Sequence, residues 1–135
     1  MPDLARLTAA EMSSRTAFEM VGIGRDAIDV VECYDSFTIT VLMTLEALGF
    51  CKRGEGGAFV SDQRIAPGGS FQLNTNGGGL SYCHPGMYGI FLLVEAVRQL
   101  RGEAGDRQVQ GAKTALVHGT GGTLSSGGTV ILSNN

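Results

Sequence analysis

The feature that most constrains this chain is a glycine run followed by a histidine, a proline and an apolar segment. Glycine lacks a Cβ, so such a run can turn sharply or approach a ligand closely. Pro85 stands where a helix can begin, since its missing N–H would be unpaired there anyway. Residues 90–94 are apolar on every side, which predicts a helix buried between layers. The pattern therefore predicts that His84 is held still beside a helix N-terminus. The glycines that form the turn are Gly77, Gly78 and Gly79.

Length and charge favour one globular unit. The 135 residues are enough for a single domain over 1–135, and a chain of this size can bury roughly 68% of its unfolded surface. The net charge of −3, with basic residues scattered along the chain, is not typical of a nucleic-acid partner. No apolar run approaches the length of a membrane span, and the N-terminal residues have no apolar core typical of a signal peptide.

The three cysteines form no CxxC spacing, and no spacing of cysteines or histidines predicts a metal site. An odd count of this kind indicates reduced thiols in a cytoplasm rather than a disulfide framework. We interpret Cys33 and Cys51 as small buried apolar residues. Cys83 has two interpretations: a packing residue, or a thiol acidified near a helix start.

Local signals predict three helices. Thr8 and Glu11 have capping-box spacing ahead of a helix over 8–21, which a glycine at 22 can end. A second helix over 37–48 is expected to start at Asp35 or Ser36 and to end before a glycine at 49. Its apolar stripe is predicted to include Phe37. The third helix is expected over 86–101.

The strands predict a layered α/β sheet. Residues 28–33 are β-branched and mostly apolar, which favours a buried strand, and 71–73 could form a brief one. Segments 113–118 and 128–132 are predicted to pair in an antiparallel way, joined by a glycine-rich connection over 119–127 at a pocket mouth. Residues 50–70 show no sustained period. Helices and strands alternate, so we expect helices layered on a mixed sheet that looks incomplete.

Seven side chains with useful chemistry lie just after a strand or at a helix start, where open α/β sheets bind ligands. Two histidines there could act as general base and acid near neutral pH. A hydrogen-bonded structural role is the alternative for each histidine, and packing is the alternative for the tyrosines. The candidates are His84, His118, Tyr34, Tyr82, Tyr88, Cys83 and Asp35.

Four motifs in order resemble the C-terminal half of thiolases, and in detail the lipid-transfer-protein (sterol-carrier-protein-x) thiolases and bacterial steroid side-chain aldolases. They are Asp29-Val-Val-Glu-Cys-Tyr-Asp-Ser-Phe37, Asn76-Gly-Gly-Gly79, Cys83-His-Pro-Gly-Met-Tyr-Gly89 and His118-Gly-Thr-Gly-Gly122.

The resemblance implies a thiolase-like C-terminal domain whose first strands and partner N-terminal half are absent from this chain. It also implies an acyl-CoA substrate without a covalent cofactor, a homodimer or higher oligomer, and an OB-fold (DUF35) partner in the aldolase branch. In that family the histidine that matches His84 activates a nucleophilic cysteine of the N-terminal half and helps to bind the thioester oxygen. Gly77, Gly78 and Gly79 would bring the backbone close to the CoA thioester. A P-loop is excluded, because no Lys-Ser/Thr follows them.

The departures from the family pattern bear on the reaction. Tyr34 stands where thiolases have Asn or His, and His118, or Val117 beside it, replaces the cysteine that serves as acid and base. Loss of that cysteine disfavours thiolysis. A retro-aldol cleavage needs a base and donors to an enolate oxygen, which His84, His118, Tyr34 and Tyr88 could supply. The alternative is a non-catalytic lipid-transfer or scaffold protein. In either case we expect the isolated chain to be inactive.

Overall fold

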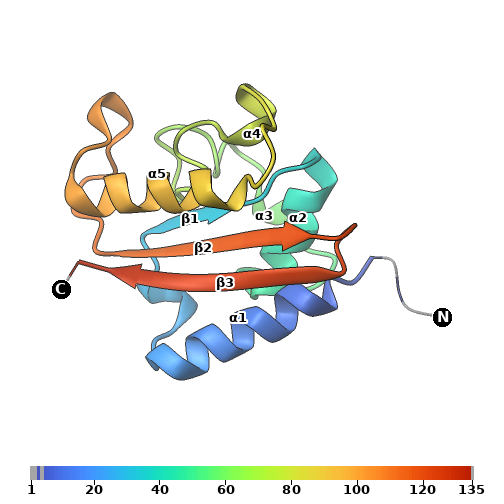
Figure 1. Ribbon diagram of the computed structural model, residues 1–135. Coiled ribbons are helices and arrows are strands. Elements are labelled where there is room, and N and C mark those ends of the chain that lie inside the picture. The colour runs from blue at the N-terminus through green and yellow to red at the C-terminus, as the bar shows by residue number, and fades with distance from the viewer. Residues whose placement is uncertain (1–2, 4, 135) are drawn as a thin grey trace.

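The computed structural model describes residues 3 and 5–134, which form a mixed three-stranded sheet with helices on both faces (Figure 1). Strand β1 (Val30–Cys33) runs parallel to β2 (Thr114–Gly121), and β2 pairs antiparallel with β3 (Ser126–Ser133). Helix α5 (Gly89–Arg101) covers one face, and α1 (Thr8–Val21) lies across the other, next to α2 (Thr38–Leu48). The predicted arrangement of helices on a mixed sheet is confirmed.

Side-chain alternation along the strands divides the core in two. On the α5 face, Val30 and Val117 pack with Leu92 of the helix. On the opposite face, Val31 and Leu116 pack with α1 and α2. Each strand residue therefore faces one side of the sheet, and polar side chains on opposite faces cannot meet.

Helix α1 has the predicted bounds, but its capping box is wrong. The residue before the helix is Leu7, and no side chain caps its first turn. Glu11 instead forms an ion pair with Arg6, at 2.8 Å. Gly22 ends the helix in the left-handed conformation, at φ 73°, and its N–H donates to the Phe18 carbonyl.

Helix α2 begins one residue later than predicted, and neither Asp35 nor Ser36 caps it. The Thr40 hydroxyl, which lies in the first turn, pairs with the backbone of Phe37. Phe37 is 67% exposed, so its place in the buried stripe is wrong, whereas Val41 and Leu45 are buried as expected.

Helix α5 starts at Gly89 rather than at 86, so the expectation that Pro85 opens the helix is wrong. Gly86 and Met87 before it have positive φ angles, which no helix continues. The expectation of burial on all sides is also wrong for this chain. Leu92 is fully buried, but the outward side of the helix exposes Ile90, Phe91 and Val94.

The segment without a sequence period folds over the edge of β1. It contains the one-turn helix α3 (Gly56–Phe59), and the rings of Phe50 and Phe59 meet Phe71 edge-on at 5.1 Å each. The brief strand expected at 71–73 is reduced to a single parallel bridge between Leu73 and Val31. Aromatic packing thus orders this loop.

Short elements complete the chain. These are the 3-10 turns Arg25–Ala27 and Gly105–Arg107 and the one-turn helix α4 (Gly78–Ser81). Strands β2 and β3 are longer than expected and are joined by residues 122–125 instead of 119–127. Among the described residues, no helix has the length and apolar character that a membrane crossing needs.

Candidate functional site

Three aromatic side chains of the predicted site meet where β1 ends. Tyr34 follows β1 directly, Tyr88 immediately precedes α5, and His84 lies in the loop between α4 and α5. The ring centroids of Tyr34 lie 5.6 Å from His84 and 5.9 Å from Tyr88. The His84 and Tyr88 rings are 6.3 Å apart. The structure therefore brings together three of the five predicted catalytic side chains.

These side chains line a cavity of about 610 Å³. Its walls come from the end of β1, the first turn of α2, the start of α5, and residues 119–124, which are the end of β2 and the turn that follows it. The glycine-rich turn forms one side of the mouth, as the sequence predicted. Such an opening, with aromatic walls and a few polar groups, suits the reactive end of a small organic ligand.

The glycine run makes its close backbone approach to Asp35 of its own chain. The Asp35 carboxylate accepts the Gly79 N–H at 2.9 Å and the Leu80 N–H at 3.1 Å. Gly78 has a φ of 68°, and a Cβ built there would lie 2.2 Å from Asp35 Oδ2. Gly77, Gly78 and Gly79 do not line the aromatic cavity.

The residues before the glycines are fixed to β1 one after another, which the sequence analysis missed. The Asn74 side chain accepts the Cys33 N–H at 2.8 Å and donates to the Cys33 carbonyl at 3.0 Å. The Thr75 N–H and hydroxyl both bond Glu32 Oε1. Asn74 thus serves as a short extra strand partner, and the loop beside the cavity is held in register with β1.

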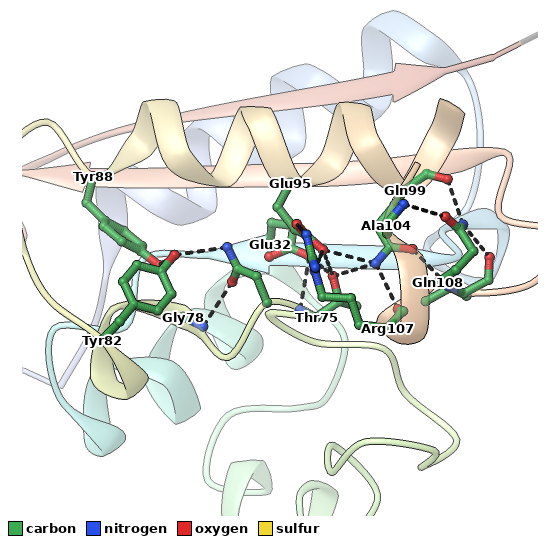
Figure 2. Close-up of polar contacts among 12 residues, drawn as sticks. Glu32, Thr75, Gly78, Tyr82, Tyr88, Glu95, Gln99, Ala104, Arg107 and Gln108 are labelled. Carbon is green, nitrogen blue, oxygen red and sulfur yellow. Dashed lines mark hydrogen bonds and ion pairs between the residues drawn. The ribbon is translucent and has the colours of Figure 1, made fainter. Parts of the chain in front are cut away.

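A buried polar network lies under α5 behind the aromatic groups (Figure 2). Glu95 receives both arms of the Arg107 guanidinium at 2.9 Å, together with bonds from Thr75 and Gln99. Burial opposes ionisation of Glu95, but these donors hold its pKa below the usual range. Burial raises the pKa of Glu32 to about 8, and its Oε2 has no partner among the described residues. The network thus carries one carboxylate charge for one guanidinium at pH 7.

Tyr88 is 3% exposed and pairs with another tyrosine. Its hydroxyl lies 2.9 Å from that of Tyr82, and the hydroxyl of Tyr82 accepts a bond from Asn76 Nδ2 at 2.9 Å (Figure 2 shows the two tyrosines). Burial, followed by the contact with Tyr82, raises the pKa of Tyr88 well above its ordinary value. Tyr88 therefore stays protonated across the neutral range and acts there as a hydrogen-bond donor or acceptor rather than a base.

His118 lies on the other face of the sheet, so the structure does not bring it to the aromatic cavity. Its Nδ1 pairs with Thr129 at 2.9 Å, and Thr129 in turn pairs with Ser13 of α1. Burial lowers the pKa of His118 to about 4, and its Nε2 has no partner in the described chain. Val117 faces α5 instead. Strand alternation explains the separation, but residues 115–117 are all apolar and buried, so no pattern in the sequence assigned His118 to one face.

The cysteines also lie outside the cavity. Cys33 is fully buried on the α2 side, as predicted, and Cys51 is partly buried. Cys83 is exposed. None of these thiols lines the aromatic cavity.

Comparison with known proteins identifies the family of this chain. A family model described as thiolase C-terminal domain-like matches residues 1–134. Sterol carrier protein 2 of Rattus norvegicus is 44% identical over 110 residues, which cover 81% of this chain and 20% of that protein. Acetyl-CoA acetyltransferase of Methanothermobacter thermautotrophicus is 41% identical over 122 residues, covering 90% of this chain and 32% of that protein.

A solved structure named "Ltp2-ChsH2(DUF35) aldolase" superposes with a TM-score of 0.78 at 31% identity. The match covers 93% of this chain and 32% of that one. The chain thus spans about a fifth to a third of the relatives that it matches. Since the family model matches nearly every residue, the chain belongs to the thiolase C-terminal domain family.

Proposed function

We propose that this chain is the C-terminal part of an acyl-CoA enzyme that cleaves a carbon–carbon bond next to a thioester by a retro-aldol reaction. The observation that carries the proposal is the meeting of His84, Tyr34 and Tyr88 in a cavity that none of the three described cysteines lines. Val117 faces the same side of the sheet as these groups, where the motif resemblance expects the acid–base cysteine. Hydrogen-bonding groups without a thiol suit a retro-aldol step better than thiolysis.

In this reaction a β-hydroxyacyl-CoA loses the proton of its β-hydroxyl group to a base. The O–H electron pair forms the new carbonyl, and the Cα–Cβ bond breaks toward Cα. The thioester enolate that results takes this proton back at Cα and leaves as a shorter acyl-CoA. We assign the hydroxyl proton to Tyr34, and donation to the enolate oxygen to His84 and Tyr88. No oxidant, reductant or covalent cofactor is required.

Two comparisons favour this class of substrate. One relative is named as an acetyl-CoA acetyltransferase, and the similar solved structure is named as an aldolase. The motif resemblance to steroid side-chain aldolases points to a lipid or steroid side chain as the acyl group of this substrate.

We also propose that the working enzyme is an oligomer with a DUF35-type partner, because the similar solved structure carries DUF35 in its name. The outward face of α5, with Ile90, Phe91 and Val94, is apolar and exposed in this chain. Exposed patches of this kind are typical of protein contacts. Sedimentation of the chain at high micromolar concentration should show self-association, and a well-folded monomer would count against it.

The test of the reaction uses two substrates with the longest natural subunit that carries this chain. A steroid β-hydroxyacyl-CoA should be cleaved to a ketone and a shorter acyl-CoA, while acetoacetyl-CoA plus CoA should not turn over. Thiolysis as the faster reaction would replace the retro-aldol assignment. The 135-residue chain alone should give no turnover above buffer with either substrate, because it spans only about a fifth to a third of the relatives that it matches.

A further inference from the structure

The buried Tyr88 hydroxyl can make one more hydrogen bond than it has among the described residues. It is almost fully buried, yet its hydroxyl bonds only one described group, the hydroxyl of Tyr82 at 2.9 Å. A phenol group has one hydrogen to donate and can accept at least one bond. The direction of the bond between the two tyrosines therefore decides whether the hydrogen of Tyr88 is free for a ligand.

Asn76 fixes the start of this chain of hydrogen bonds. Its side-chain oxygen accepts the Gly78 N–H at 3.0 Å, so its amide nitrogen is the atom that faces Tyr82. An amide nitrogen only donates, so the Tyr82 oxygen must be the acceptor in that bond. The hydrogen of Tyr82 is then available to Tyr88, and each accepted bond strengthens the next donated one. This head-to-tail order leaves the hydrogen of Tyr88 without an acceptor among the described residues.

We propose that Asn76 and Tyr82 are positioning residues that make the Tyr88 hydroxyl a hydrogen-bond donor to the thioester oxygen of the substrate. This inference rests on the proposed function, because it names a ligand of the same aromatic cavity, which Tyr88 lines. The raised pKa of Tyr88 is consistent with it, since the hydroxyl keeps its proton. A buried donor hydrogen is rarely left unpaired, and a substrate oxygen would complete the chain.

The opposite order gives a different outcome. If Tyr88 donates to Tyr82, then Tyr82 accepts two bonds and points its own hydrogen at water, which its 47% exposure would allow. Tyr88 would then present no hydrogen to a ligand. Removal of the Tyr82 hydroxyl would release that hydrogen and improve catalysis. The two orders thus predict effects of opposite sign for one substitution.

Three variants of the longest natural subunit test the order. Tyr82→Phe keeps the ring but removes the hydrogen bond that strengthens the donor Tyr88. One oxyanion donor contributes about 10²- to 10³-fold to the rate, and cooperativity changes the free energy of a bond by about 10–30%. The kcat of this variant should therefore fall about two- to eightfold. Asn76→Asp keeps an oxygen for Gly78 but turns the donor into an acceptor. Tyr82 should then donate to the new carboxylate and accept from Tyr88, so kcat should fall about 10²-fold.

The double variant Asn76→Asp with Tyr82→Phe is the matched control for the added charge. Without the Tyr82 hydroxyl, the carboxylate cannot draw the hydrogen of Tyr88 away from the cavity. The double variant should therefore return to the two- to eightfold loss of Tyr82→Phe alone. The proposal would be overturned if the kcat of the double variant were as low as that of Asn76→Asp, or if the kcat of Tyr82→Phe were higher than that of the wild type.

A spectroscopic measurement separates this inference from the proposed reaction. The probe is acetyl-CoA with a ¹³C-labelled thioester carbonyl, whose infrared stretch moves to lower frequency when the oxygen accepts a hydrogen bond. The wild-type subunit should show the largest shift, Tyr82→Phe a smaller one, and Asn76→Asp and Tyr88→Phe only the part that His84 supplies. A shift reduced in Tyr88→Phe but unchanged in Asn76→Asp overturns the relay and leaves the proposed function standing. No binding of the probe by the wild-type subunit overturns both.

Discussion

Glu32 and Glu95 direct carboxyl oxygens at the same hydroxyl group, each 2.8 Å from Thr75 Oγ1. One hydroxyl has one hydrogen, so it cannot satisfy both carboxylates. Arg107 pairs with Glu95 alone, and Glu32 keeps its proton near neutral pH, with its pKa raised to about 8. The segment before the glycine run therefore rests on a neutral acid and an ion pair rather than on two charges.

The first prediction concerns Glu32→Gln. In the folded chain the pKa of Glu32 lies near 8, and in the unfolded chain near 4.3, so the folded state holds the extra proton between these values. Its contribution to stability is present below about pH 4.3 and is lost as the pH rises through 8, at roughly 1.4 kcal/mol per pH unit. The glutamine variant keeps the Oε1 acceptor for Thr75 and should not lose stability over this range.

Urea denaturation from pH 5 to 8 checks this, with Glu95→Gln as the matched control. Glu95 has a lowered pKa, so its contribution is present at neutral pH and is lost as the pH falls. The control should be less stable than the wild type at pH 7, because it breaks the fork with Arg107. Equal pH profiles for the wild type and Glu32→Gln would contradict the assignment of a neutral Glu32.

The second prediction concerns His118, for which the stability of the fold changes with pH in the direction opposite to that for Glu32. Burial lowers its folded pKa to about 4, below the unfolded value near 6.5. The unfolded state therefore binds more protons between these values, and stability is lost as the pH falls from 6.5 to 4, by about 3 kcal/mol in total. His118→Asn removes this titration and keeps a polar atom for Thr129.

Glu32 and His118 have opposite slopes between about pH 4.3 and 6.5, so they should partly cancel in the wild-type chain. Glu32→Gln should then show stability that rises with pH in this window, and His118→Asn stability that falls. Denaturation curves of the double variant should be nearly flat there. A single-variant profile that matches the wild type would show that the corresponding group does not titrate as described.

Local rules predicted much of the fold, and long-range pairing accounts for what they missed. Helix 8–21 and the end of α2 before Gly49 follow from periodicity and from the glycine after each helix. Asp35 was expected to cap α2 but caps α4 through Gly79 and Leu80, a pairing across more than forty residues that no local pattern indicates. The same holds for Thr75 on Glu32.

The candidate site was predicted in part for the same reason. Tyr34, His84 and Tyr88 each lie at the end of an element, so the topology alone brings them to one edge of the sheet. His118 lies in the middle of a pairing strand, where the face is set by parity, and parity depends on the register with β1. Packing was one of the two interpretations of Tyr82, and its hydrogen bonds with Asn76 and Tyr88 were not predicted.

The third prediction compares two glycines with positive φ. Gly78→Ala adds a methyl group 2.2 Å from Asp35 Oδ2 at φ 68°, whereas Gly86→Ala meets open space at φ 82°. The left-handed conformation alone costs roughly 1–2 kcal/mol for an alanine. Gly86→Ala should lose about that much stability, and Gly78→Ala clearly more, because the carboxylate that holds α4 must move. Equal losses of stability for the two variants in urea denaturation would show that the contact with Asp35 does not add to the cost of the substitution.

The last prediction concerns Tyr34→Phe and Tyr88→Phe in the longest natural subunit. Each removes one hydroxyl and leaves a ring in the aromatic group around His84, so stability should barely change. The proton of the β-hydroxyl must still leave, and the enolate oxygen must still meet a donor. General acid–base groups such as Tyr34 contribute about 10²- to 10⁴-fold to the rate, and one oxyanion donor such as Tyr88 about 10²- to 10³-fold, or roughly 3–5 kcal/mol of barrier. We therefore expect kcat on a β-hydroxyacyl-CoA to fall by a factor in this range for each variant.

Steady-state kinetics with the same substrate separates this role of the two tyrosines from a role in binding. An interaction made mainly in the transition state lowers kcat and kcat/KM together, with little change in KM. A thiol mechanism predicts the reverse pattern, with both phenylalanine variants near full kcat and Cys83→Ala inactive. The exposed place of Cys83, outside the residues that line the cavity, disfavours that outcome.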